Sequence, residues 1–311
     1  MTSIAANLQA VRRRIEWAAR EAGRAPDSVQ LIAVSKTWPA ERVAEAHACG
    51  QRAFGENQVQ EGVEKITQLT NLALEWHVHS GRHEISRTHA DVPGPSSGVA
   101  SPQGGASEGG RGALGDLTPE TPVGSEFARR TDDRLHGRIP QAGPCSTLHR
   151  SLLLPLEWHF IGPVQSNKTR PISEHFQWVH GVEREKVAVR LNDARPAHLP
   201  PLDVCIQVNV SGEGSKSGVE PGQEAELARI VAGLPRLRLR GLMAIPEPTA
   251  DRKLQRRRFA LLRDAKDRLV AAGYALDTLS MGMSDDLEAA ILEGATMVRV
   301  GTAIFGKRRE K

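Results

Sequence analysis

Short apolar runs alternate with amphipathic stretches along most of this 311-residue chain, and this alternation constrains the fold more than any other feature. Eight runs have the length and composition of buried strands: residues 31–34, 52–56, 157–161, 178–182, 203–210, 239–245, 278–283 and 297–304. Helical spacing recurs between them, in residues 39–50, 58–69, 166–175, 184–193, 223–233, 252–272 and 285–293. Strands that alternate with helices form parallel sheets, and eight repeats predict a closed TIM-type (β/α)8 barrel.

One further helix is predicted ahead of the first strand. Apolar residues recur at helical spacing over residues 1–22, namely Ile4, Leu8, Val11, Ile15, Ala18 and Ala19. An open doubly wound sheet is the structural alternative to the barrel. Such sheets commonly carry a Gly-x-Gly-x-x-Gly loop after the first strand, and no such motif follows residues 31–34. The barrel is therefore favoured.

A long insert interrupts the alternation between the second and third strands. Residues 78–156 are rich in Gly, Pro, Ser and Thr, a composition that buries too little apolar surface to offset the entropy of ordering. We therefore expect a disordered insert that divides the barrel into a first part, residues 1–77, and a remainder, residues 157–311. Because long surface insertions cost little loop entropy, the barrel should tolerate it.

The insert is flanked by two nearly identical hexapeptides. Residues 72–77 read Leu-Ala-Leu-Glu-Trp-His, and residues 154–159 read Leu-Pro-Leu-Glu-Trp-His. A duplication or a retained insertion is the simplest explanation. The second copy continues directly into the apolar Phe160, so we assign the third strand to it.

The composition excludes several classes of protein. With 39% hydrophobic and 25% charged residues, the chain has the balance of an ordinary soluble domain. Its net charge of +4 and its short basic runs at 12–14, 256–258 and 307–309 lack the concentrated basic face of a nucleic-acid binder. Three scattered cysteines do not suggest a disulfide framework or a metal site. No signal peptide or membrane-spanning run is evident, which predicts a cytosolic protein with no membrane partner.

Lys36 ends the first apolar run, so its ammonium group should stand at the mouth of the barrel above an apolar stem. Desolvation there would lower the pKa of the amine and prepare it to attack an aldehyde and form an imine. A lysine that merely reaches from a strand end to solvent is the alternative interpretation. Lys168 and Lys216 are rival amines in loop-like or helix-start positions, where solvent holds a pKa near its usual value.

The loops after the last two strands are candidates for a phosphate site. Ser284 lies at a strand-to-helix junction, and Gly301 and Thr302 lie inside or just past the last strand. In TIM barrels these loops frequently bind phosphate through backbone N–H groups and hydroxyls. Ser284 could equally be a helix cap, and the acids Asp285 and Asp286 would repel a dianion unless they point away.

Arg299 and Asn57 are two further polar candidates, and both are expected at the same end of the barrel as Lys36. Arg299 is a charged residue within the apolar eighth run, and a buried arginine needs an acceptor. A glutamate inside the barrel or the nitrogen of a bound pyridine ring would serve, and the sequence does not decide between them. Asn57, after the second run, is either a site residue or the cap of the next helix.

Five motifs, in order, resemble the pyridoxal phosphate homeostasis proteins, the YggS/PROSC family. They are residues 34–37, 54–57, 157–168, 280–286 and 299–306. The resemblance covers nearly all of the chain outside residues 78–156. It implies a TIM-like barrel similar to the N-terminal domain of alanine racemase, which binds pyridoxal 5′-phosphate (PLP) in the cytosol and has no established catalytic turnover.

The same resemblance implies a role for each candidate residue. Lys36 matches the lysine that forms an imine with PLP, and Arg299 matches the arginine that faces the pyridine nitrogen. The positions that match the phosphate-binding residues are Ser284, Gly301 and Thr302. Asn57 and Met243 match positions near the cofactor ring.

A PLP carrier is favoured over an amino-acid racemase. A racemase needs acid–base groups on both faces of the substrate carbon, and racemases with this barrel resemble one another in taking a tyrosine from a further domain of the partner subunit. The one tyrosine here, Tyr274, is expected at the opposite end of the barrel from Lys36. An arginine beside the ring nitrogen also weakens the ring as an electron sink. We therefore predict a monomer or weak dimer that binds PLP, with PLP-dependent apoenzymes as candidate partners.

Overall fold

The fold is seen in a computed structural model that describes residues 3–72, 155–212 and 217–307. These residues lie within one compact unit formed by residues 1–79 and 142–311. The prediction of a disordered insert at 78–156 falls outside the described residues, apart from 155 and 156, and stays a prediction together with the division of the barrel that depends on it.

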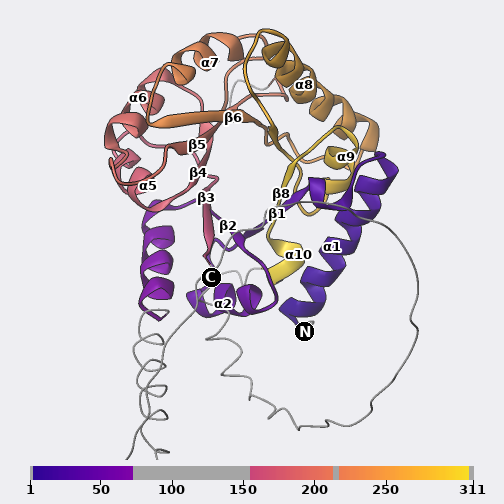
Figure 1. Cartoon of the computed structure of the whole chain (residues 1–311). Coiled ribbons are helices and arrows are strands. Elements are labelled where there is room, and N and C mark those ends of the chain that lie inside the picture. Colours follow the sequence, from indigo (N-terminus) through magenta and orange to yellow (C-terminus); the bar gives the residue numbers. More distant parts are fainter. Residues whose placement is uncertain (1–2, 73–154, 213–216, 308–311) are drawn as a thin grey trace, which may run out of the picture. The chain divides into compact units, whose positions relative to one another are not determined.

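Eight parallel strands close into a barrel in chain order (Figure 1). Their bounds are β1 Gln30–Val34, β2 Ala53–Glu56, β3 Glu157–Phe160, β4 Trp178–Val182, β5 Leu202–Gln207, β6 Leu237–Met243, β7 Thr278–Ser280 and β8 Met297–Val300. The first strand pairs with β2 and also with β8, where Ile32 is in register with Arg299. The TIM-type barrel is therefore confirmed, and the open sheet is excluded.

Helices surround the strands on the outside of the barrel (Figure 1). They are α1 Ile4–Glu21, α2 Ala40–Ala48, α5 Thr169–His175, α6 Glu185–Ala194, α7 Glu224–Ala232, α8 Arg252–Ala271, α9 Leu287–Leu292 and α10 Thr302–Phe305, with a 3-10 turn at Pro26–Ser28. A further helix begins at residue 59 and reaches residue 72, where the described range ends. None of the described helices is long and apolar enough to cross a membrane.

The extra N-terminal helix forms as predicted. The Ser3 hydroxyl accepts a hydrogen bond from the backbone N–H of Ala6 at 3.2 Å, which satisfies one of the free donors at the start of α1. All six apolar residues of the predicted stripe are buried. They pack α1 against α9 and α10, so this helix supports the side of the barrel where the last two loops lie.

Five strands, the third and the fifth to the eighth, were predicted too long at their carboxyl ends, and the last two of these matter most for the cavity. The eighth ends at Val300 rather than Ile304, and the chain turns into the short helix α10. Ile304 and Phe305 are apolar because α10 buries them, and a short apolar run does not distinguish a strand from a buried helix. The seventh strand ends at Ser280, since Gly282 then adopts a φ of 93°, a conformation that favours glycine.

The second copy of the duplicated hexapeptide forms the third strand, as predicted. Glu157 is in register with Ala53 of β2, and Phe160 with Glu56. Of the first copy only Leu72 is described, at the end of its helix. The second copy is thus the one that completes the sheet between β2 and β4.

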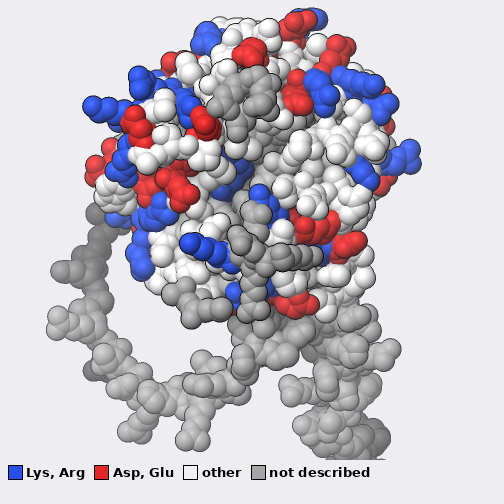
Figure 2. Space-filling view, turned by 180° about the vertical axis from the view of Figure 1, so that it is seen from behind, with Lys and Arg blue, Asp and Glu red and all other residues white. Residues whose placement is uncertain are grey.

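Basic and acidic side chains are interspersed over the face seen in Figure 2. Two of the three basic runs lie on helices beside acids: Arg14 of α1 pairs with Glu288, and Arg256 of α8 pairs with Glu293, each at 2.6 Å. Of the third run, only Lys307 is described.

Candidate functional site

A cavity of about 350 Å³ lies at the carboxyl ends of the strands, within the range of roughly 300–1,000 Å³ typical of ligand sites. Loops after β1, β2, β3, β7 and β8 form its walls. Six of the seven predicted site residues line it: Lys36, Asn57, Ser284, Arg299, Gly301 and Thr302. Residues separated by more than 260 positions in the chain thus meet because β8 pairs with β1.

Lys36 is the second residue after β1 and is half-buried. Val34 and Trp38 line the same cavity beside it, and the indole of Trp38 stacks on Phe305 at 6.1 Å between ring centroids. Thr37 has a φ of 67°, the single non-glycine residue with positive φ among those described. Since such backbone costs energy unless neighbours hold it, the loop at Lys36 is fixed by contacts elsewhere.

Lys65 supplies those contacts from the helix at 59–72. Its ammonium group donates to the carbonyl oxygen of Ser35 at 2.7 Å, to Glu56 Oε1 at 2.8 Å and to Glu61 Oε1 at 2.6 Å. Glu61 in turn accepts from the backbone N–H of Thr37. Ser35 and Thr37, which flank Lys36, are therefore held by the ammonium group of Lys65 and by the carboxylate of Glu61.

Glu56 completes this cluster at the end of β2. Its carboxylate is fully buried and accepts from the Ser35 hydroxyl at 2.6 Å. Burial raises the pKa of Glu56, while the nearby ammonium of Lys65 opposes that shift. Sequence reasoning missed Lys65. The available signal was its spacing of four from Glu61 and from Leu69 on the buried face of a helix that follows β2.

Asn57 carries an unsatisfied polar atom. Its side-chain Oδ1 is buried and has no hydrogen-bond partner among the described residues. Buried polar groups are nearly always paired, and an orphaned acceptor that lines a cavity is a place for a ligand donor.

The predicted phosphate corner is built from the ends of two loops. Thr302 begins α10, and the first N–H groups of a helix have no partner inside it. Gly301 precedes it, and Ser284 lines the same cavity. One acid is turned away: Asp286 Oδ1 accepts from the backbone N–H of Met283 at 2.6 Å, and burial raises its pKa. Asp285 remains exposed at the cavity.

Arg299 projects from β8 to the floor of the cavity and is only 3% exposed. Its guanidinium donates to the Ser280 hydroxyl at 2.6 Å and to the carbonyl oxygen of Ala244 at 2.9 Å. No carboxylate of the described residues lies within ion-pair distance of it, so the glutamate expected as one alternative is not its acceptor. Burial lowers the pKa of Arg299 to about 10, which leaves it cationic at neutral pH.

The remaining candidates lie elsewhere. Met243 is buried inside the barrel in a cluster with Cys205 and Met297, and it does not line the cavity. Lys168 precedes α5 and does not line it either, whereas Lys216 is outside the described residues. Tyr274 precedes β7 and Lys36 follows β1, so they lie at opposite ends of a parallel barrel, as expected.

Comparison with known proteins defines the class. Residues 6–309 match the family described as alanine racemase, N-terminal domain. The chain belongs to the pyridoxal phosphate homeostasis protein branch of these barrels, because curated relatives of that name match over its full length. The relative from Pseudomonas aeruginosa is 46% identical over 99% of this chain and 97% of its own. The relative from Escherichia coli K12 is 42% identical over 99% and 98%.

Solved structures agree with the fold. The PipY protein of Synechococcus elongatus, in a structure with PLP bound, has a TM-score of 0.63 and 28% identity over 98% of this chain and all of its own. An alanine racemase of Clostridium difficile has a TM-score of 0.54 at 12% identity over 99% of this chain and 58% of its own, a likeness of fold alone.

Proposed function

We propose that this chain binds PLP through an imine at Lys36 and serves PLP homeostasis. The observation that carries the proposal is that Lys36, Arg299 and the start of α10 line one cavity. The amine, the ring-facing cation and the phosphate corner are the three groups that such a cofactor requires. The names of the curated relatives and the PLP-bound PipY structure support the same ligand.

Each part of the cofactor has a matching group in the cavity. Lys36 supplies the amine for the aldehyde, and the bound cofactor would then offer an electrophilic imine. The phosphate would accept from the N–H groups at the start of α10 and from the hydroxyls of Ser284 and Thr302. Arg299 can only donate, so it would pair with an unprotonated pyridine nitrogen. The orphaned Oδ1 of Asn57 would accept from a donor on the ligand.

A carrier fits these residues better than an amino-acid racemase. The described residues that line the cavity include no tyrosine to act as the second base of a racemase, and Tyr274 lies at the other end of the barrel. An unprotonated ring nitrogen is also a weak electron sink. PLP-dependent apoenzymes as recipients, a cytosolic location and a monomeric or weakly dimeric state are parts of this proposal.

The visible spectrum of the purified protein with added PLP tests it. We expect an imine band in the wild type that is lost in Lys36→Ala and retained in Lys168→Ala, the matched lysine outside the cavity. Absence of the band in the wild type would contradict the proposal. Exchange of the α-hydrogen of alanine in deuterated water would instead favour the racemase.

A further inference from the structure

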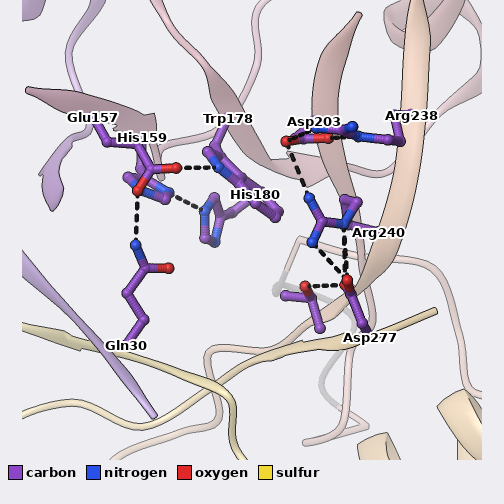
Figure 3. A network of polar contacts seen from close by, with 10 residues as sticks. Gln30, Glu157, His159, Trp178, His180, Asp203, Arg238, Arg240 and Asp277 are labelled. Carbon is purple, nitrogen blue, oxygen red and sulfur yellow. Dashed lines mark hydrogen bonds and ion pairs between the residues drawn. The ribbon is translucent and has the colours of Figure 1, made fainter. Parts of the chain in front are cut away.

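A row of polar side chains crosses the interior of the barrel from β3 to β8. We call it the interior polar chain, and it consists of Glu157, His159, His180, Ser280 and Arg299. His159 Nδ1 lies 2.9 Å from His180 Nε2, and His180 Nδ1 lies 2.7 Å from the Ser280 hydroxyl (Figure 3 shows the two histidines). The same hydroxyl accepts from Arg299 at 2.6 Å.

This chain is dry. Both histidines and Ser280 are fully buried, and Arg299 is nearly so. A buried polar group that lacks a partner costs about 1–3 kcal/mol, so each member depends on the next. The chain also ends at Arg299, which lines the proposed PLP cavity, and this links the chain to the site.

The far end of the chain is a firmly held carboxylate. Glu157 Oε2 accepts from Gln30 at 2.7 Å, and Oε1 accepts from the Trp178 indole at 2.8 Å (Figure 3). His159 Nε2 lies 3.4 Å from Oε2. These contacts, with that to His159 first, lower the pKa of Glu157 to about 2, so it is ionised and can only accept.

The chemistry of Arg299 fixes the direction of the hydrogen bond at that end of the chain. Arg299 is only a donor, so the Ser280 hydroxyl accepts from it. Burial, with the charges of His159 and Arg299, lowers the pKa of His180 well below its usual value, so His180 is neutral. With His159 neutral, Ser280 donates to His180 Nδ1 and His180 Nε2 donates to His159 Nδ1; with His159 protonated beside Glu157, both of these hydrogen bonds reverse. In either arrangement the Ser280 hydroxyl accepts from Arg299, and His159 Nε2 has no hydrogen-bond partner among the described residues.

We propose that Ser280 and His180 are positioning residues for Arg299. They hold its guanidinium in place at the cavity, because the oxygen that accepts from Arg299 is itself hydrogen-bonded to His180. The inference deepens the proposed function, on which it rests: the position of the group that would face the pyridine nitrogen depends on Ser280 and His180. The other charged or ionisable groups that act on Arg299 are Asp286 and Cys205.

Removal of the Ser280 oxygen tests this. Ser280→Ala should weaken PLP binding about tenfold, the value of a hydrogen bond to a charged group, and should shift the pH midpoint of the visible imine band. Thr278→Val is the matched control: Thr278 lies two residues earlier in β7, and its buried hydroxyl contacts Asp277 and not the interior polar chain. It should leave both readouts unchanged.

A second pair of variants separates the loss of the hydrogen bond to Ser280 from a general loss of the folded structure. His180→Leu removes every partner at similar volume, whereas His180→Asn keeps an acceptor toward Ser280. We expect the leucine variant to match Ser280→Ala and the asparagine variant to retain most of the affinity. If folded Ser280→Ala and His180→Leu bind PLP with the wild-type affinity and show the wild-type pH midpoint of the imine band, the inference is overturned. An equal loss of PLP affinity in the control Thr278→Val would also overturn it. A wild type without an imine band would overturn the proposed function and the inference with it.

Discussion

The ammonium group of Lys65 lies 2.7 Å from the carbonyl oxygen of Ser35, the residue directly before Lys36. Through this contact a buried cation on the helix at 59–72 holds the backbone that presents the proposed imine lysine. The Glu61 carboxylate holds the other side of the same loop through the N–H of Thr37. The site therefore depends on a cluster that does not itself line the cavity.

Lys65→Met should destabilise the protein by about 3–5 kcal/mol, because it leaves the buried Glu56 carboxylate without its cation. Chemical denaturation measures this. In the double variant with Glu56→Gln the loss should be smaller than the sum of the two single losses. Additive losses would show that the two groups do not interact.

Gly282→Ala should impair the Ser284 loop. A Cβ there would lie 2.6 Å from the Cβ of Ala290, and the residue has a φ of 93°. Gly273→Ala is the matched control, because Gly273 has a φ of 96° and no atom within 4 Å of the added carbon. Both variants carry the backbone strain, and only Gly282→Ala adds overpacking of about 1–3 kcal/mol. Thermal melting should rank them in that order, and only Gly282→Ala should bind PLP more weakly.

Removal of the Ser284 and Thr302 hydroxyls should weaken the binding of PLP but not the binding of pyridoxal. Ser284→Ala combined with Thr302→Val should weaken binding of PLP by about 10–100-fold and leave binding of pyridoxal, which has no phosphate, unchanged. Titration followed by absorbance measures both ligands, with Thr67→Val on the helix at 59–72 as a control. An equal loss for the two ligands would place the phosphate elsewhere.

The stability of the protein should fall as the pH is lowered from 6.5 to 4 in a way that depends on His47. Arg52 donates to His47 Nε2 at 3.0 Å, and burial followed by the charge of Arg52 lowers the pKa of His47 from 6.5 to about 4. Below pH 6.5 the unfolded chain binds a proton that the folded protein does not, so folding loses free energy. Urea denaturation over this range should show a shallower pH dependence in His47→Gln. Identical profiles would indicate that His47 titrates normally in the folded protein.

The barrel and most of its rim were predictable, because they follow from periodicity and from chain order. The stripe of α1 and the choice of Glu157–Phe160 for the third strand are examples, since each depends on residues adjacent in sequence. Met243 was placed by resemblance alone, and the structure buries it in a core cluster and not among the residues that line the cavity. Lys65 and the interior polar chain were not predicted. Their partners come from different strands and helices, and single-sequence patterns do not report which buried polar residues face each other.

Reduction with borohydride followed by peptide mass mapping shows directly whether the amine of Lys36 carries the cofactor. We expect one pyridoxyl adduct per chain, located on the peptide that contains Lys36 and absent from Lys36→Ala. An adduct on Lys65, Lys168 or Lys216, or none at all in protein incubated with PLP, would contradict this expectation.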